Sequence, residues 1–247
     1  MDFYILLAIF AITLLVGVLA SMIGLGGGFL MVPILALIFD LPVKIAIGTS
    51  TLVVTFVGLS SAISYNKKKL IDPGLVIPLA FGAVVGAQIG AMSTLSISGD
   101  LLKRLIGVVF ISISILMALR KEKVNEGPYR ISKSLLLVSG LLIGAYSGLL
   151  GMGGGVLMVP LLNLLGAPIH FAVATSSAIT FFSGFSGATR HFIMDQVDMK
   201  IGLIASLGVV IGAQIGPKIA VKLESGTLKS FFALIIALIG VVMIIHP

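Results

Sequence analysis

Long apolar runs separated by short polar stretches make up most of this chain. At a rise of about 1.5 Å per residue, roughly 20 apolar residues are needed to cross a hydrocarbon core ~30 Å thick. Two apolar stretches, 28–39 and 155–165, are too short to cross as straight helices. Runs of adequate length lie at 3–23, 43–64, 74–97, 101–119, 134–150, 169–189, 200–221 and 228–245. The pattern predicts an all-α polytopic membrane protein with eight long and two short helices.

The composition agrees with a chain that lies almost wholly in the bilayer. Of 247 residues, 58% are hydrophobic and 10% are charged, and the mean hydropathy is +1.23. No polar stretch exceeds about fifteen residues, so no soluble domain is expected. Cysteine is absent, which excludes disulfides, thiolate ligands and a cysteine nucleophile. We expect no metal and no cofactor. We also expect no nucleic-acid partner, because the net charge of +7 lies in loops and has a topological explanation.

The chain contains an internal repeat. GLGGGFLMVPIL at 24–35 and GMGGGVLMVPLL at 151–162 share nine of twelve positions at an offset of 127, and later matches follow an offset of 126. The repeat predicts two homologous halves, a first transmembrane repeat at 1–119 and a second at 134–247, joined by a cytoplasmic linker at 120–133. Internal repeats of this kind are common in secondary transporters, where the halves form one integrated transport domain.

The distribution of positive charge predicts how the two halves are oriented. If each half contributes about five crossing elements, the loops 65–72, 120–133 and 217–229 share one side and hold 3, 5 and 3 of the sixteen Lys and Arg residues. The positive-inside rule puts this side in the cytoplasm. We therefore expect two inverted-topology repeats in the cell (inner) membrane, with both termini extracytoplasmic.

The duplicated glycines predict a broken helix in each half. Unpaired backbone amides in a bilayer cost several kcal/mol, so a break is tolerated only where protein or a water-filled cavity receives the freed groups. Each break starts a short helix whose first amides have no intrahelical partner, and a helix N-terminus carries roughly half a positive charge. We expect opposed helix N-termini at Gly26, Gly27 and Gly28 and at Gly153, Gly154 and Gly155 to bind a small anion near the membrane midplane. Tight helix packing is the alternative explanation of the glycines.

These motifs resemble a known family. The duplicated GxGGGxLxVP, followed about sixteen residues later by a Thr-Ser pair in GTSTL and ATSSA, is similar to the sulfite exporter TauE/SafE family, also called the toluene-sulfonate uptake permease family. The resemblance covers essentially the whole chain. It implies transport of sulfite, sulfoacetate or other sulfur-containing or organic anions.

Polar residues inside the predicted spans are further candidates for substrate binding. Gln88 and Gln214 each lie within a GxxxGxxxG ladder and project about 160° away from the glycine line, so the glycines pack a neighbouring helix while each amide faces another group. The amide either donates to an oxyanion or caps the broken backbone. The Thr-Ser pairs either contact the anion or bond back to their own helix. These pairs are Thr49 and Ser50, and Thr175 and Ser176.

Several functions remain compatible with this pattern. The favoured function is an exporter, because all nine carboxylates lie in loops or at helix ends and leave no evident proton relay. The alternatives are an anion channel and a proton- or sodium-coupled organic-anion uptake permease. A remote alternative is an intramembrane serine protease, since Gly184-Phe-Ser186-Gly187 matches GxSG, although no base for Ser186 is evident. His191, near a predicted helix end, is expected to be solvated or to form a basic vestibule with Arg190.

Overall fold

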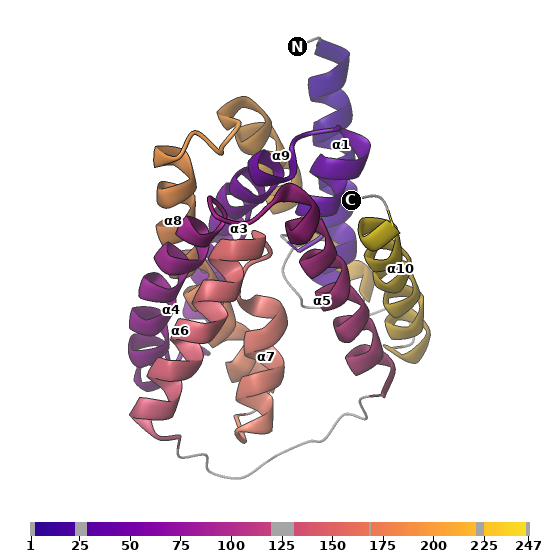
Figure 1. The fold of residues 1–247 in the computed structure, drawn as a ribbon. Coiled ribbons are helices and arrows are strands. Elements are labelled where there is room, and N and C mark those ends of the chain that lie inside the picture. Colours follow the sequence, from indigo (N-terminus) through magenta and orange to yellow (C-terminus); the bar gives the residue numbers. More distant parts are fainter. Residues whose placement is uncertain (1–2, 23–28, 120–130, 168, 221–224, 246–247) are drawn as a thin grey trace.

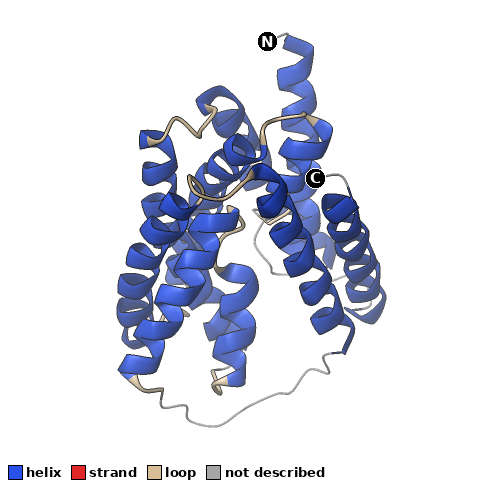
Figure 2. Cartoon of the chain, in the orientation of Figure 1, coloured by secondary structure: helices blue, strands red, loops and turns tan. Residues whose placement is uncertain are grey.

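The computed structural model describes residues 3–22, 29–119, 131–167, 169–220 and 225–245. Every regular element in these ranges is helical (Figure 2). This result follows from the apolar sequence, because in lipid a helix satisfies its own backbone hydrogen bonds. The predicted all-α class is confirmed for the described residues.

The long helices closely match the predicted apolar runs. Each predicted run from 3–23 to 228–245 corresponds to one helix, with ends that differ by a few residues. The long helices are α1 (Phe3–Met22), α3 (Val43–Lys67), α4 (Pro73–Ser93), α5 (Gly99–Leu119), α6 (Lys133–Leu150), α8 (Ile169–Ile193), α9 (Met199–Ala220) and α10 (Ser225–Ile245). The start of α4 shows why a boundary falls where it does: Pro73 occupies the first helical position, and the Asp72 side chain accepts a hydrogen bond of 2.8 Å from Gly74 N.

Two elements are short, as predicted. The first comprises α2 (Met31–Pro33) and a π-helical segment, η1 (Ile34–Ile38). The second is α7 (Gly155–Leu164), ten residues long, which spans only about 15 Å. Neither can cross the hydrocarbon core alone.

The main helix contacts join the first half of the chain to the second. α4 packs along α6 and α1 packs along α9, while α3 pairs with α8 and α5 pairs with α10. By the sequence repeat, α1 corresponds to α6 and α4 corresponds to α9, so the first two contacts are reciprocal. Both chain ends lie at one end of the molecule, whereas α5 ends and α6 begins at the opposite end (Figure 1).

Glycine ladders explain how closely these helices approach. A Cβ atom at Gly86 of α4 would overlap the carbonyl oxygen of Leu141 in α6, and one at Gly212 of α9 would overlap the carbonyl oxygen of Leu14 in α1. Leu14 and Leu141 are themselves equivalent at the repeat offset of 127. The prediction that the ladders pack neighbouring helices is therefore confirmed.

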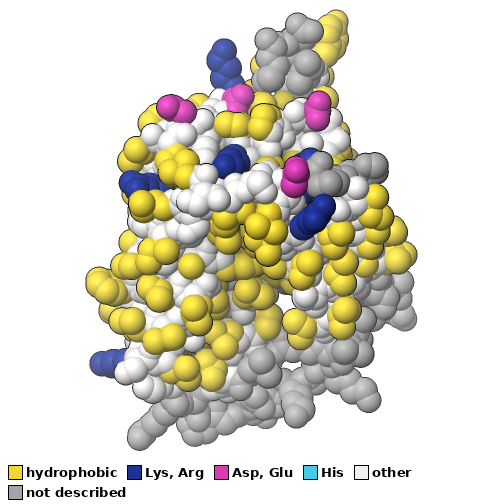
Figure 3. Space-filling model, in the orientation of Figure 1, with side chains coloured by type: hydrophobic (Ala, Val, Ile, Leu, Met, Phe, Trp, Pro, Cys, Tyr) yellow, Lys and Arg dark blue, Asp and Glu magenta, His cyan; other side chains and the backbone are white. Residues whose placement is uncertain are grey.

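The surface has the pattern of a membrane protein. Figure 3 shows a broad apolar surface across the middle of the molecule, with most of the visible charged side chains near the upper end. Four described helices or helix segments are long and apolar enough to cross a membrane: Val43–Lys67, Pro73–Ser93, Lys133–Leu150 and Phe171–Ile193.

Candidate anion site at the broken helix

The second glycine cluster breaks the chain between α6 and α7. Gly151 caps α6 in the left-handed conformation, with φ of 68°, and its amide donates to the Ser147 carbonyl oxygen at 2.9 Å. Gly153 also has a positive φ, 73°, which glycine adopts without steric cost. Gly154 is then the N-cap of α7, and Gly155 is its first residue. The predicted position of the break and of the short helix is confirmed in this half.

Close packing fixes where the break lies. A Cβ atom on Gly153 would come within 2.6 Å of Val54 Cγ1 in α3 and 3.4 Å of Thr180 Cγ2 in α8. Val54 and Thr180 are equivalent at the repeat offset of 126, and each is the twelfth residue of a helix of 25 residues. The break therefore meets α3 and α8 near the middle of both helices.

The start of α7 presents backbone donors. Its first hydrogen bond runs from the Met158 amide to the Gly154 carbonyl oxygen at 2.9 Å, so the amides of Gly155, Val156 and Leu157 have no intrahelical acceptor. Such amides, together with the helix dipole, favour an anion. The matching glycines of the first half, Gly26, Gly27 and Gly28, lie outside the described residues.

The first Thr-Ser pair contacts protein rather than open space. The Ser50 hydroxyl donates to the Gly151 carbonyl oxygen at 2.6 Å, and Thr49 Oγ1 accepts from the Asp198 amide at 2.9 Å. Ser50 therefore holds the end of α6 at the break. The second pair, Thr175 and Ser176, is also buried, and Thr175 Oγ1 has no hydrogen-bond partner among the described residues.

The two glutamines differ in their surroundings. The side-chain nitrogen of Gln88 donates to the backbone oxygen of Ser186 at 2.8 Å and to its hydroxyl at 3.0 Å. Gln88 thus joins α4 to α8 and does not cap the broken backbone of α7. Gln214 is exposed at the surface of the described residues.

His191 is buried near the end of α8. The expectation of a solvated histidine is wrong, because its side chain is 0% exposed. Its Nε2 donates to the Gly148 carbonyl oxygen at 2.8 Å, and its Nδ1 pairs with the Gln196 side-chain amide at 2.8 Å. Ser183, Gly187 and His191 follow each other at intervals of four residues and therefore share one face of α8, and this run of small residues was the signal from which a buried His191 could have been predicted.

The environment of Ser186 bears on the protease alternative. Its hydroxyl donates to the Val84 carbonyl oxygen at 2.9 Å and accepts from Gln88. Both ring nitrogens of His191 are engaged with Gly148 and Gln196. The serine and the histidine are therefore not arranged as nucleophile and base. Within the described residues, no group of three or more His, Cys, Asp or Glu side chains is suited to hold a metal ion.

Comparison with known proteins identifies the family. The profile of the family described as "Sulfite exporter TauE/SafE" matches residues 9–243. The chain belongs to this TauE/SafE family. It is therefore a membrane transporter, in agreement with the names of its relatives. Its long apolar helices make it a protein that crosses the membrane several times.

Curated relatives cover nearly the whole chain. It is 32% identical over 253 residues to the "Probable membrane transporter protein YunE" of Bacillus subtilis (strain 168), with 92% of this chain and 93% of the relative covered. It is 29% identical over 262 residues to the "Probable membrane transporter protein MJ0441" of Methanocaldococcus jannaschii, with coverage of 99% and 97%. No solved structure matches this chain.

Proposed function

We propose that this TauE/SafE protein is a secondary carrier that exports small sulfur-containing anions, such as sulfite or organosulfonates, across the inner membrane. The observation that carries the proposal is the position of the α7 N-terminus against Val54 and Thr180, midway along α3 and α8. A small anion at this point is stabilised by backbone amides alone and needs no buried lysine or arginine.

We further infer that the two halves are inverted repeats that form one transport domain. The reciprocal contacts α1–α9 and α4–α6 support this arrangement, as do the equivalent pairs Leu14 with Gly212 and Leu141 with Gly86. An odd number of elements in each half turns the second half over relative to the first. By this symmetry, Gly26, Gly27 and Gly28 supply the opposing donors.

Other polar residues complete the proposed site. Gln88 and Gln214 offer amide donors, although an anion has to compete with Ser186 for the amide of Gln88. The pairs Thr49 with Ser50 and Thr175 with Ser176 act on the glycine breaks from the neighbouring helices. The bond from Ser50 to the Gly151 carbonyl oxygen supports that role for one pair.

The charge distribution supports the orientation and the direction of transport. With the 65–72 and 120–133 loops in the cytoplasm, both termini are extracytoplasmic. An inside-negative membrane potential contributes roughly 2.3 kcal/mol per charge per 100 mV to the outward movement of an anion. Export therefore needs no coupled ion.

The test is anion flux in proteoliposomes with an imposed membrane potential, using sulfite, sulfoacetate, sulfate and chloride in turn. We expect saturable flux of sulfite or sulfoacetate that follows the potential. Flux that requires a pH or sodium gradient would instead indicate a coupled permease. Unsaturable passage of chloride would indicate a channel and contradict the carrier.

A further inference from the structure

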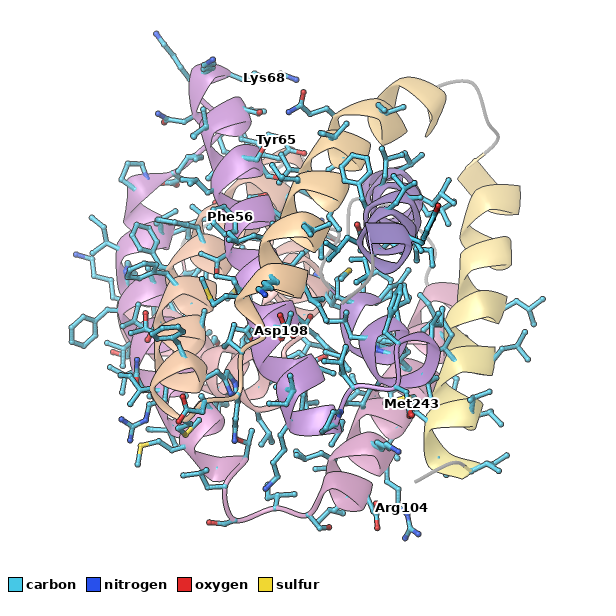
Figure 4. The ribbon with its side chains drawn as sticks, turned by 90° about the horizontal axis from the view of Figure 1, so that it is seen from above. Phe56, Tyr65, Lys68, Arg104, Asp198 and Met243 are labelled. Atoms are coloured by element: carbon cyan, nitrogen blue, oxygen red, sulfur yellow. The ribbon has the colours of Figure 1, made fainter. Side chains whose placement is uncertain are left out.

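The two ends of the α3–α8 pair differ in their hydrogen bonds. One end, where α3 begins, is covered by the segment between α8 and α9, and we call it the α9 end. The other end, where α8 begins, corresponds to the α9 end by the sequence repeat. Here α3 ends and the segment between α3 and α4 starts, and we call it the α4 end. Figure 4 views the molecule from the α9 end, where Asp198 lies near the middle while Arg104 lies at the rim.

At the α9 end, polar groups from several helices are bonded together. The Asp198 amide donates to Thr49, and His191 joins the Gly148 carbonyl oxygen of α6 to the Gln196 side chain. Thr94 Oγ1, just after α4, lies 3.1 Å from Gln196 Oε1. The α8–α9 segment is thereby fastened to α3, α4 and α6.

Gly48 permits this closure by its lack of a side chain. A Cβ atom at Gly48 would overlap the carbonyl oxygen of Gln196 and come within 3.0 Å of His191 Cβ. The equivalent residue at the α4 end is Ala174, whose methyl group in the same geometry would overlap the carbonyl oxygen of Leu70. The α9 end is therefore built for a closer approach than the α4 end.

The α4 end has a tyrosine and two apolar residues in place of the three polar residues of the α9 end. The residues that correspond to His191, Gln196 and Thr94 are Tyr65, Leu70 and Ala220. Thr175, the counterpart of Thr49, is fully buried, and within the part of the chain that the structure describes its Oγ1 has no hydrogen-bond partner. Thr49 Oγ1 thus accepts a hydrogen bond at the α9 end, while Thr175 Oγ1, its counterpart at the α4 end, accepts none from the described residues.

We propose that Thr49, Thr94, His191 and Gln196, with Gly48 beneath them, form a latch that holds the α9 end of the carrier shut. When the latch opens, the α4 end, which is already buried, is tightened, and Thr175 Oγ1 accepts a hydrogen bond from the Asp72 amide, the counterpart of the Asp198 amide. This inference rests on the proposed carrier function, because only a carrier needs its two ends to open in turn. The latch makes the α9-closed state the resting state.

Thiol labelling tests the latch, since the wild-type chain has no cysteine. Ala46→Cys and Ala172→Cys are matched reporters: both alanines are 0% exposed, and they lie at equivalent positions near the starts of α3 and α8. A membrane-permeant maleimide reports the opening of each end in proteoliposomes of either orientation. We expect Ala172→Cys to be labelled faster than Ala46→Cys.

Latch variants should shift this ratio. Thr49→Val removes one hydrogen bond, so we expect labelling of Ala46→Cys to rise about 2–10-fold and labelling of Ala172→Cys to fall. Gly48→Ala should change the labelling ratio in the same direction. Gln196→Leu should do so too, because leucine is the residue at the equivalent position of the α4 end. The matched control Thr175→Val breaks no bond of the closed state and should not raise labelling of Ala46→Cys. Size-exclusion chromatography identifies any variant that fails to fold.

Two outcomes would overturn the latch: equal labelling of both reporters in the otherwise wild-type chain, or an unchanged ratio in folded Thr49→Val. Labelling needs no substrate, so the assay is independent of the flux measurement. If no sulfur anion is transported but the labelling ratio shifts as expected, only the substrate assignment fails. If flux is normal and the ratio does not shift, only the latch fails.

Discussion

The contacts of α4 with α6 and of α1 with α9 differ in chemistry from the contact of α3 with α8. Along α4 and α6, a Cβ atom on Gly82, Gly86 or Gly90 would overlap a backbone carbonyl oxygen of the partner helix. Between α3 and α8, a Cβ atom on Gly58 would also meet backbone, the Phe181 amide nitrogen at 2.6 Å, but one on Gly184 or Gly187 would first meet a threonine side chain, Thr55 Oγ1 at 2.8 Å or Thr51 Cγ2 at 3.2 Å. Thr51, Thr55 and Ser177 each donate to the carbonyl oxygen four residues earlier in their own helix.

We infer that the α4–α6 and α1–α9 contacts form a fixed scaffold, whereas the α3–α8 contact is the interface that takes part in transport. Backbone atoms in contact leave no room for relative movement without a large loss of packing. Hydroxyls that bond back to their own helix can rotate toward a passing anion at little cost, because membrane side-chain hydrogen bonds are worth only about 0.6 kcal/mol on average. We expect transport to depend on the α3–α8 region and folding to depend on the ladders.

The largest effect is expected in a ladder. Gly86→Leu forces a side chain into the Leu141 carbonyl oxygen, and overpacking typically costs about 1–3 kcal/mol, with more expected against backbone. We expect little monodisperse protein after size-exclusion chromatography, and the same result for the equivalent Gly212→Leu. The control Val85→Leu, at an exposed position beside the ladder, should elute like the wild type. A well-folded Gly86→Leu protein would remove the distinction between scaffold and interface.

A smaller effect on folding, with a large effect on transport, is expected at the break. Gly153→Ala strains a residue with φ of 73° by about 1–2 kcal/mol and places a methyl group against Val54. We expect at least a tenfold loss of anion flux, a change of about 1.4 kcal/mol or more. Gly166→Ala is the matched control, since Gly166 also has a positive φ, 96°, but follows the far end of α7. If both variants lose flux equally, backbone strain alone explains the result.

The smallest effect on stability is expected for Gln88→Leu. It removes two hydrogen bonds to Ser186, worth about 1 kcal/mol together, and also removes the amide donor from the proposed site. We expect folded protein with its transport abolished. Ser93→Ala, in the last turn of the same helix, is the control and should transport normally. Ser186→Ala distinguishes the role of Gln88 as a donor to the anion from its role in bonding to α8. Equal losses of anion flux in Gln88→Leu and Ser186→Ala would indicate that Gln88 acts by holding α8.

Much of the fold could be predicted because its causes are local. The apolar runs located the ends of the long helices within a few residues, and GMGGG located the break before α7. The glycine ladders correctly indicated close helix packing. In each case the signal is hydrophobic length or glycine spacing, which lies within one segment of the chain.

The polar contacts were harder to predict because their partners are remote in sequence. Ser50 bonds to Gly151 and Thr49 to Asp198, separations of 101 and 149 residues. His191 was placed wrongly because a position near a helix end suggested solvent, whereas the α8–α9 segment folds back over it. That segment reaches the histidine only because residue 48 is a glycine.

The contact of α1 with α9 has a consequence for biosynthesis. The partner of the first helix leaves the ribosome near the end of translation, so α1 waits in the membrane with one glycine-matched face uncovered until α9 is inserted. No half of this chain can complete its own packing, since its main contacts are all to the other half. Separate polypeptides covering 1–119 and 134–247 should therefore be degraded when made alone and should assemble when made together. Each half of this protein is incomplete until it meets the other, and their connection in one chain guarantees that they meet.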